Sequence, residues 1–169
     1  MNKPYNYLPV LLIFLSFFSS QAFATGSLKI SEEGDLNVNA DVVWEVIGDF
    51  GGLAKWLNPN MSVELQGTST DAGSTRTLTM GNGFSITEAL VDYSKENRSY
   101  SYIVIGGGGS VKNYLSTLKV VPTGANTSKV VWSATFDPGE GADDAAAREG
   151  MSNIYKGAIE GIKQHFKTQ

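Results

Sequence analysis

Two residues of opposite charge, Arg76 and Glu88, stand in a hairpin-like stretch whose other alternate positions are apolar. An arginine keeps its proton and can hold or polarise an oxygen, whereas a glutamate can accept hydrogen bonds or transfer a proton. If strand pairing brings the two together in a pocket, they can hold the polar part of a ligand or act on it. Their chemistry therefore depends on the register of the two strands that carry them.

The loop Gly81-Asn82-Gly83 decides that register. A two-residue Asn82-Gly83 turn would place the apolar residues of the two strands on opposite faces, because a slip of one residue reverses every side chain. A three-residue loop places them all on one face. The pairs are then Met80 with Phe84, Leu78 with Ile86, and Arg76 with Glu88. The apolar pattern favours this second register, with the charged pair on the concave, core-facing side of the sheet.

A buried ion pair often fails to recover its desolvation cost, so the predicted position of this pair needs an explanation. In one interpretation, Arg76 and Glu88 line a pocket and meet a polar group of a ligand. In the other, they lie at the rim of the sheet, partly wet, as an ordinary cross-strand ion pair. The pocket interpretation predicts that Arg76→Ala empties the protein of ligand and leaves its melting temperature little changed.

The same alternation supplies aromatic and apolar candidates for the rest of the pocket. Tyr102 and Tyr114 each combine a flat ring with one hydroxyl, which can stack on a ligand or donate to it. Either tyrosine taken alone is more typical of an ordinary core. The predicted apolar walls are Trp44, Phe84, Trp132 and Ile154.

The elements that would position these residues follow an α+β order. A first strand from Leu28 to Val38, whose apolar alternation breaks only near Glu33-Gly34, precedes two short helices over 40–48 and 53–57, the first capped by Asn39. Alternating residues then predict six strands: Ser62–Gly67, Ser74–Met80, Phe84–Tyr93, Ser99–Ile105, Lys112–Val121 and Lys129–Phe136. One long amphipathic helix follows and would cover one face of a curling sheet.

An apolar stripe that includes Met151 and Ile154 predicts this last helix. Gly150, Gly157 and Gly161 interrupt it, at a cost of about 1 kcal/mol each in a helix interior. We expect these glycines to mark a place where the helix lies unusually close to another element; the alternative is that they are merely tolerated. Where helix and sheet splay apart, the two can enclose a cavity.

Residues 1–24 are expected to be a cleaved leader. Lys3 precedes an apolar run, Leu8 to Phe18, that is too short to span a bilayer. The small residues of Ala22-Phe23-Ala24 predict cleavage after Ala24, with no stable membrane insertion. Residues 25–169 then form a single domain that is periplasmic or secreted.

The composition argues against several classes of partner for this domain. The chain carries 13 basic and 17 acidic residues, for a net charge of −4. Loss of Lys3 makes it one unit more negative, and no basic cluster is present, which argues against nucleic acid or anionic membrane as a partner. The absence of cysteine and a single histidine, His165, remove most metal sites. We therefore expect no metal and no other cofactor.

Motifs spread over nearly the whole predicted domain resemble one protein superfamily. They include Asn39 to Trp44, Asp49-Phe50, Gly73 to Arg76, Glu88 to Leu90 and Phe136-Asp137-Pro138. In this order they resemble the polyketide cyclase/dehydrase-like branch of the START/Bet v 1-like (SRPBCC) superfamily. The resemblance implies a helix-grip fold, in which a curved antiparallel sheet of six to seven strands wraps round a long C-terminal helix. It implies no single activity, because hormone receptors, lipid carriers and cyclases share the fold.

Within this branch the chain is similar to two characterised kinds of protein. Plant lachrymatory-factor synthases, which isomerise a sulfenic acid, are thought to use an arginine and a glutamate that correspond to Arg76 and Glu88. Their tyrosines match Tyr102 and Tyr114. The periplasmic accessory proteins of methanol oxidation share the export signal and the strand Arg-Thr-Leu-Thr. Many relatives carry Leu-Pro where this chain has Gly106 to Gly109, so the resemblance does not imply a shared gating loop.

Three functions are compatible with these features. The first is an exported binding domain for a small hydrophobic ligand with a polar head, in which Arg76 holds an anionic or carbonyl oxygen and Glu88 orients Arg76 or accepts from a ligand hydroxyl. The second is a cofactor-independent isomerase or cyclase, in which Glu88, ionised beside the arginine, starts as a base. The third is an accessory interaction protein for a periplasmic dehydrogenase.

Overall fold

The computed structural model describes residues 26–168 apart from 59 and 108–110. The predicted leader over residues 1–24 lies outside the described residues, as do residues 108 and 109 of the glycine loop. All the other predicted elements lie within them.

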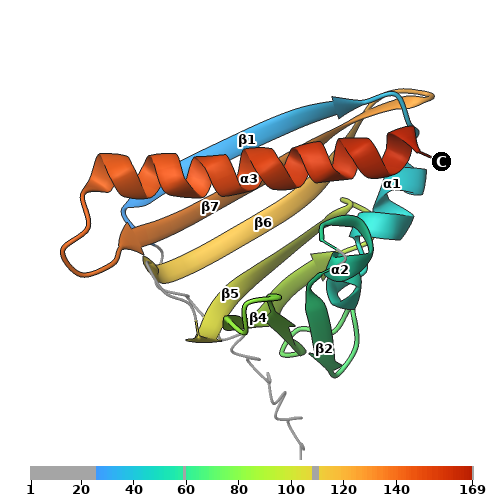
Figure 1. Ribbon diagram of the computed structural model, residues 1–169. Coiled ribbons are helices and arrows are strands. Elements are labelled where there is room, and N and C mark those ends of the chain that lie inside the picture. Colours follow the sequence, from blue (N-terminus) through green and yellow to red (C-terminus); the bar gives the residue numbers. More distant parts are fainter. Residues whose placement is uncertain (1–25, 59, 108–110, 169) are drawn as a thin grey trace, which may run out of the picture.

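The centre of the fold is a sheet of seven strands in which every pair is antiparallel (Figure 1). Along the sheet the strands follow the order β1-β7-β6-β5-β4-β3-β2. Their bounds are β1 (Leu28–Leu36), β2 (Ser62–Gln66), β3 (Thr75–Thr79), β4 (Ser85–Ser94), β5 (Ser99–Gly107), β6 (Val111–Gly124) and β7 (Thr127–Pro138). This confirms the α+β order and the six strands predicted after the short helices.

The helices cover one side of the sheet. Their bounds are α1 (Ala40–Ile47), the 3₁₀ turn η1 (Phe50–Gly52), α2 (Leu53–Trp56) and α3 (Asp144–Lys167). Asn39 caps α1 as predicted, since its Oδ1 accepts from the backbone N–H of Asp41 at 2.8 Å. Helix α3 runs the length of the sheet, and α1 and α2 lie together near its C-terminal end (Figure 1). The arrangement is a helix-grip fold.

The first strand is continuous through the point near Glu33-Gly34 where its apolar alternation breaks, and it ends at Leu36. Strand β1 pairs with β7 without interruption, from Leu28 opposite Phe136 to Leu36 opposite Ser128. The glycine at this point, Gly34, lies beneath α3. A Cβ there would stand 2.3 Å from Cγ2 of Ile159, which is closer than any side chain tolerates. Gly34 is therefore the residue that lets the helix approach the sheet.

The glycines of the helix itself do not have this role. A Cβ at Gly150 or Gly157 would meet no atom within 4 Å, and one at Gly161 would make an ordinary contact of 3.7 Å with Leu57. The expectation that these three glycines mark an unusually close approach is therefore wrong, and they are tolerated in the helix. The close approach depends on the strand beneath.

The hairpin of β3 and β4 has the predicted register. The N–H of Met80 donates to the carbonyl of Phe84, and the N–H of Gly83 donates to the carbonyl of Met80, both at 2.8 Å. Gly83 has a φ of +85°, a backbone conformation that favours glycine in a three-residue loop. Arg76 consequently stands opposite Glu88. The prediction from apolar alternation is confirmed.

The core lies between the concave face of the sheet and the helices. Alternate residues of the strands face inward, as in β7, where the even-numbered residues from 128 to 136 are buried. Fully buried core residues include Val43, Phe50, Tyr100, Leu118, Val130 and Ile162. The charged pair is therefore set in an apolar wall.

Candidate functional site

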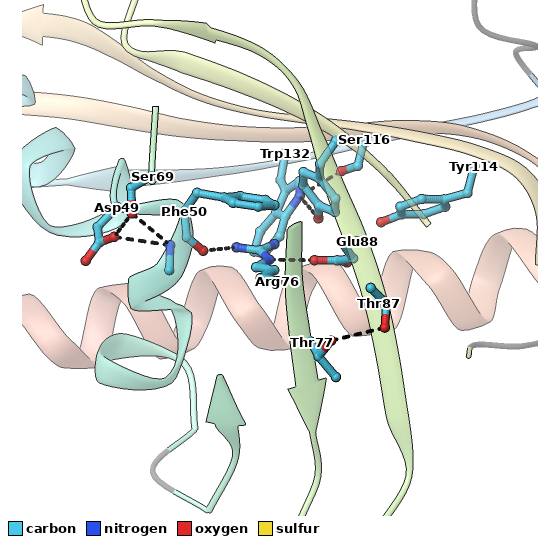
Figure 2. A network of polar contacts seen from close by, with 12 residues as sticks. Asp49, Phe50, Ser69, Arg76, Thr77, Thr87, Glu88, Tyr114, Ser116 and Trp132 are labelled. Carbon is cyan, nitrogen blue, oxygen red and sulfur yellow. Dashed lines mark hydrogen bonds and ion pairs between the residues drawn. The ribbon is translucent and has the colours of Figure 1, made fainter. Parts of the chain in front are cut away.

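Arg76 and Glu88 form a direct ion pair on the inner face of the sheet (Figure 2). Nε of Arg76 donates to Oε2 of Glu88 at 2.6 Å, and the two side chains are 1% and 8% exposed. The next residues, Thr77 and Thr87, pair their hydroxyls at 3.2 Å on the other face of the same strands. The ion pair of Arg76 and Glu88 is buried. This excludes the interpretation in which it lies partly wet at the rim of the sheet.

The guanidinium of Arg76 is enclosed on several sides. Nη1 donates to the backbone carbonyl of Phe50 at 2.8 Å. Its central carbon lies 4.1 Å from the ring centroid of Phe50 and 4.9 Å from that of Tyr102, within cation–π range. Burial alone would lower the pKa of Arg76, but the carboxylate of Glu88 more than offsets this and raises it, so the guanidinium stays charged.

Asp49 fixes the turn that presents the Phe50 carbonyl. Its Oδ1 accepts from the N–H of Gly51 at 3.1 Å and from the hydroxyl of Ser69 at 2.5 Å, and its Oδ2 accepts from Nζ of Lys55 at 2.9 Å. Partial burial raises the pKa of Asp49, but the bonds from Ser69 and Lys55 outweigh this and lower it. Figure 2 shows Asp49 and Ser69 in contact beside Phe50 and the arginine. Sequence analysis gave Asp49 no role, although an aspartate side chain often accepts from the backbone two residues later in a turn.

A chain of hydroxyl groups lies on the other side of the pair. The hydroxyls of Tyr114 and Tyr155 are 2.6 Å apart, and that of Tyr155 is 2.7 Å from Oγ of Ser116. Nε1 of Trp132 donates to Ser116 at 3.0 Å and to the hydroxyl of Tyr102 at 3.2 Å. These contacts join strands β5, β6 and β7 to helix α3.

The tyrosines of this chain stay protonated. Burial raises the pKa of Tyr102, Tyr114 and Tyr155 well above the ordinary value, and the negative charge of Glu88 acts on all three in the same direction. Sequence analysis missed Tyr155 and Ser116 as site residues. Ser116 could have been found as a polar residue between Tyr114 and Leu118 on one strand face. Tyr155 was assigned only to the apolar stripe of the helix.

These groups surround a cavity of about 410 Å³ between the sheet, α2 and α3. Its other lining residues are apolar, among them Leu53, Leu57, Leu78 and Ala158. Seven of the eight predicted site residues line it: Arg76, Glu88, Tyr102, Tyr114, Phe84, Trp132 and Ile154. The structure thus brings together residues from five strands and the last helix.

Trp44, predicted as an apolar wall of the pocket, does not line the cavity. Its ring packs against Tyr93 and Tyr100, with centroids 5.6 and 6.0 Å apart, in the part of the core beneath α1. The prediction failed because the inner face of α1 packs on this part of the core, and none of the described residues of α1 lines the cavity.

The cavity opens between the β3–β4 hairpin and α3. Phe84 and Ile154 both line it but are 48% and 63% exposed, whereas Arg76, Tyr102 and Tyr155 are at most 2% exposed. The polar groups therefore lie at the closed end and apolar side chains at the mouth.

Other types of site find no support among the described residues. Nowhere in this part of the chain do three His, Asp or Glu side chains gather closely enough to hold a metal ion. None of the described helices has the length and apolar character that crossing a bilayer requires.

Known proteins similar to this chain share its fold. Residues 27–167 match the family described as polyketide cyclase / dehydrase and lipid transport. An uncharacterised protein from Bacillus thuringiensis is 30% identical, with a TM-score of 0.74, over 82% of this chain and 98% of its own. XoxI from Bacillus cereus is 31% identical, with a TM-score of 0.73, over 82% and 94%.

A more distant similarity is to norcoclaurine synthase from Thalictrum flavum, solved with dopamine and hydroxybenzaldehyde. It is 22% identical, with a TM-score of 0.67, over 86% of this chain and 90% of its own, and supports the fold alone. No curated protein sequence matches the chain. The family match confirms the resemblance found in the sequence motifs. With its seven-stranded sheet gripping α3, the chain belongs to the polyketide cyclase/dehydrase and lipid transport family.

Proposed function

We propose that the protein is an exported binding domain for a small, largely apolar molecule with one polar head. The observation that supports this most directly is the cavity of about 410 Å³, apolar at its mouth and polar at its closed end. Ligand pockets commonly measure about 300–1,000 Å³ and combine apolar walls with a few fixed polar groups. The cavity fits that description in size and in lining.

The polarity of the cavity suggests how a ligand would lie. Apolar side chains from the sheet and from α3, such as Leu78 and Met151, would cover its body. Its polar head would reach the closed end, where Glu88 and the tyrosine hydroxyls lie. A ligand without a polar head would leave those groups facing apolar atoms, which costs free energy.

The family and the predicted leader agree with this proposal. The family name joins cyclases with lipid transport. Both activities require a cavity that admits an apolar molecule, so binding is the property they have in common. The leader predicted over residues 1–24 would place the domain outside the cytoplasm, and this is part of the proposal.

The test is displacement of a fluorescent apolar dye, together with native mass spectrometry of the purified protein. Ala158 lies on the face of α3 that lines the cavity, so Ala158→Phe is expected to obstruct it and strongly weaken dye binding. Val104→Phe enters from the opposite wall and gives a second variant should the first one unfold. Ala145→Phe, on an exposed position of the same helix, is the matched control and is expected to bind like the wild type. Equal binding by all four proteins would contradict the proposal.

An isomerase or cyclase activity is a second candidate, favoured by one observation. Oε2 of Glu88 accepts from Arg76, while Oε1 has no hydrogen-bond partner among the described residues, so a carboxylate oxygen is available to take a proton. The assay is turnover of small carbonyl or sulfenic substrates by the wild type and by Glu88→Gln, at a temperature where both are folded. Equal rates would remove this candidate.

A further inference from the structure

We propose that the polar head of the ligand is a neutral hydroxyl, of a phenol or an alcohol, and not a carboxylate or another anion. This inference rests on the proposed function and assigns the chemical class of the ligand. It follows from which polar groups at the closed end of the cavity still have hydrogen-bonding capacity.

Arg76 is the obvious anion binder of the site, but two of its three guanidinium nitrogens already donate to protein groups. Nε donates to Glu88, Nη1 donates to the carbonyl of Phe50, and rings of Phe50 and Tyr102 lie against the guanidinium. Its side chain is 1% exposed. An incoming anion would have to displace a carboxylate that is already bonded at 2.6 Å.

The charge balance of the cavity leads to the same conclusion. Arg76 and Glu88 are the only charged side chains among the described residues that line it, and together they are neutral. A ligand anion would add a second negative charge beside Glu88 in an apolar enclosure, where charges of like sign repel strongly. A neutral head avoids this repulsion and the cost of removing an ion from water.

The remaining hydrogen-bonding capacity matches a hydroxyl. An ionised carboxylate only accepts, so the unpartnered Oε1 of Glu88 requires a donor on the ligand. The hydroxyl of Tyr102 accepts from Trp132, and its hydrogen bond to Tyr114 acts to lower the pKa of Tyr114. Tyr102 and Glu88 both line the cavity. A ligand hydroxyl can donate to Glu88, whereas a ketone can only accept.

The experiment compares three probes with one ring system: 2-naphthol, which is neutral at pH 7, naphthalene and 2-naphthoate. Their affinities for the wild-type protein are measured by dye displacement. We expect 2-naphthol to bind at least about tenfold more tightly than naphthalene, since it gains a hydrogen bond to a charged acceptor. We expect 2-naphthoate to bind more weakly than naphthalene.

Two tyrosine variants locate the effect. In Tyr102→Phe the indole of Trp132 keeps its bond to Ser116, so the fold is retained. This variant is expected to lose part of the advantage of 2-naphthol over naphthalene. Tyr93→Phe is the matched control, because Tyr93 packs on Trp44 outside the cavity, and both affinities should be unchanged.

The outcomes separate the two proposals. Tightest binding of 2-naphthoate, or equal binding of 2-naphthol and naphthalene, would overturn the assignment of a hydroxyl head and leave the binding function intact. Failure of the dye and of all three probes to bind would instead remove the binding function, and the assignment with it.

Discussion

Because Arg76 and Glu88 form a buried ion pair, we expect the free energy of unfolding to fall when either residue is replaced alone. In Arg76→Met, Glu88 is left without its partner in a site where it is 6% exposed. In Glu88→Met, the guanidinium of Arg76 keeps only the Phe50 carbonyl and the aromatic faces. Leaving one buried charge unpaired typically costs about 3–5 kcal/mol, and we expect a loss of that size in each single variant.

The double variant should be more stable than either single one. Arg76→Met combined with Glu88→Met removes both charges, and apolar replacement of a buried pair is commonly neutral or stabilising. What remains is the Phe50 carbonyl without its donor, a loss of about 1–3 kcal/mol for an unsatisfied buried group. The two mutations should therefore be coupled by several kcal/mol, the mark of a direct interaction.

The assay is urea unfolding at pH 7, followed by tryptophan fluorescence. The control is the exposed pair Lys129–Glu33, whose side chains are 34% and 53% exposed and whose removal should change the midpoint little. Additive losses in the double variant, or single losses no larger than those of the control pair, would refute the reasoning. A large loss of stability in Arg76→Met would also contradict the prediction from the sequence that removal of the Arg76 side chain leaves the melting temperature little changed.

The same measurement tests two further consequences of the structure. Gly34→Ala would place a Cβ 2.3 Å from Ile159 and should cost about 1–3 kcal/mol, whereas Gly157→Ala meets open space and should stabilise by up to about 1 kcal/mol. Similar effects of the two substitutions would contradict the close approach. Asp49, with its pKa lowered from 3.8, stabilises the fold above that pH and loses its contribution as the pH falls through its lower native value. Asp49→Asn should therefore flatten the decline of the urea midpoint below pH 3.8, and an unchanged decline would exclude this role.

The sequence predicts the pairing of Arg76 with Glu88 because the information is local. The two residues are twelve positions apart and joined by one hairpin. A slip of one residue would have moved Leu78 out of the core, and the resulting penalty selects the register. The same logic of alternation placed Tyr102 and Trp132 on the inner faces of their strands, where the structure has them.

The surroundings of the pair were not predictable in the same way. The carbonyl that accepts from Arg76 belongs to Phe50, 26 residues earlier. It is a backbone atom, so no pattern of residue types predicts its role. Its position depends on a 3₁₀ turn tied to Ser69 through Asp49. The prediction that Trp44 lines the pocket was wrong for a related reason. An apolar pattern predicts which face of a helix is buried, but not which part of the core this face contacts.

These surroundings also change the roles within the pair. From the sequence, Arg76 was the group expected to hold the ligand, with Glu88 as one of its supports. The structure encloses Arg76 and leaves an oxygen of Glu88 on the cavity. A carboxylate in an apolar wall needs a fixed positive charge behind it, because an unpaired one would take up a proton or pull in water. Arg76, held by Phe50 on one side and by aromatic faces on others, supplies that charge. In the proposed function, Arg76 therefore holds Glu88 in place, and Glu88 is the residue proposed to contact the ligand.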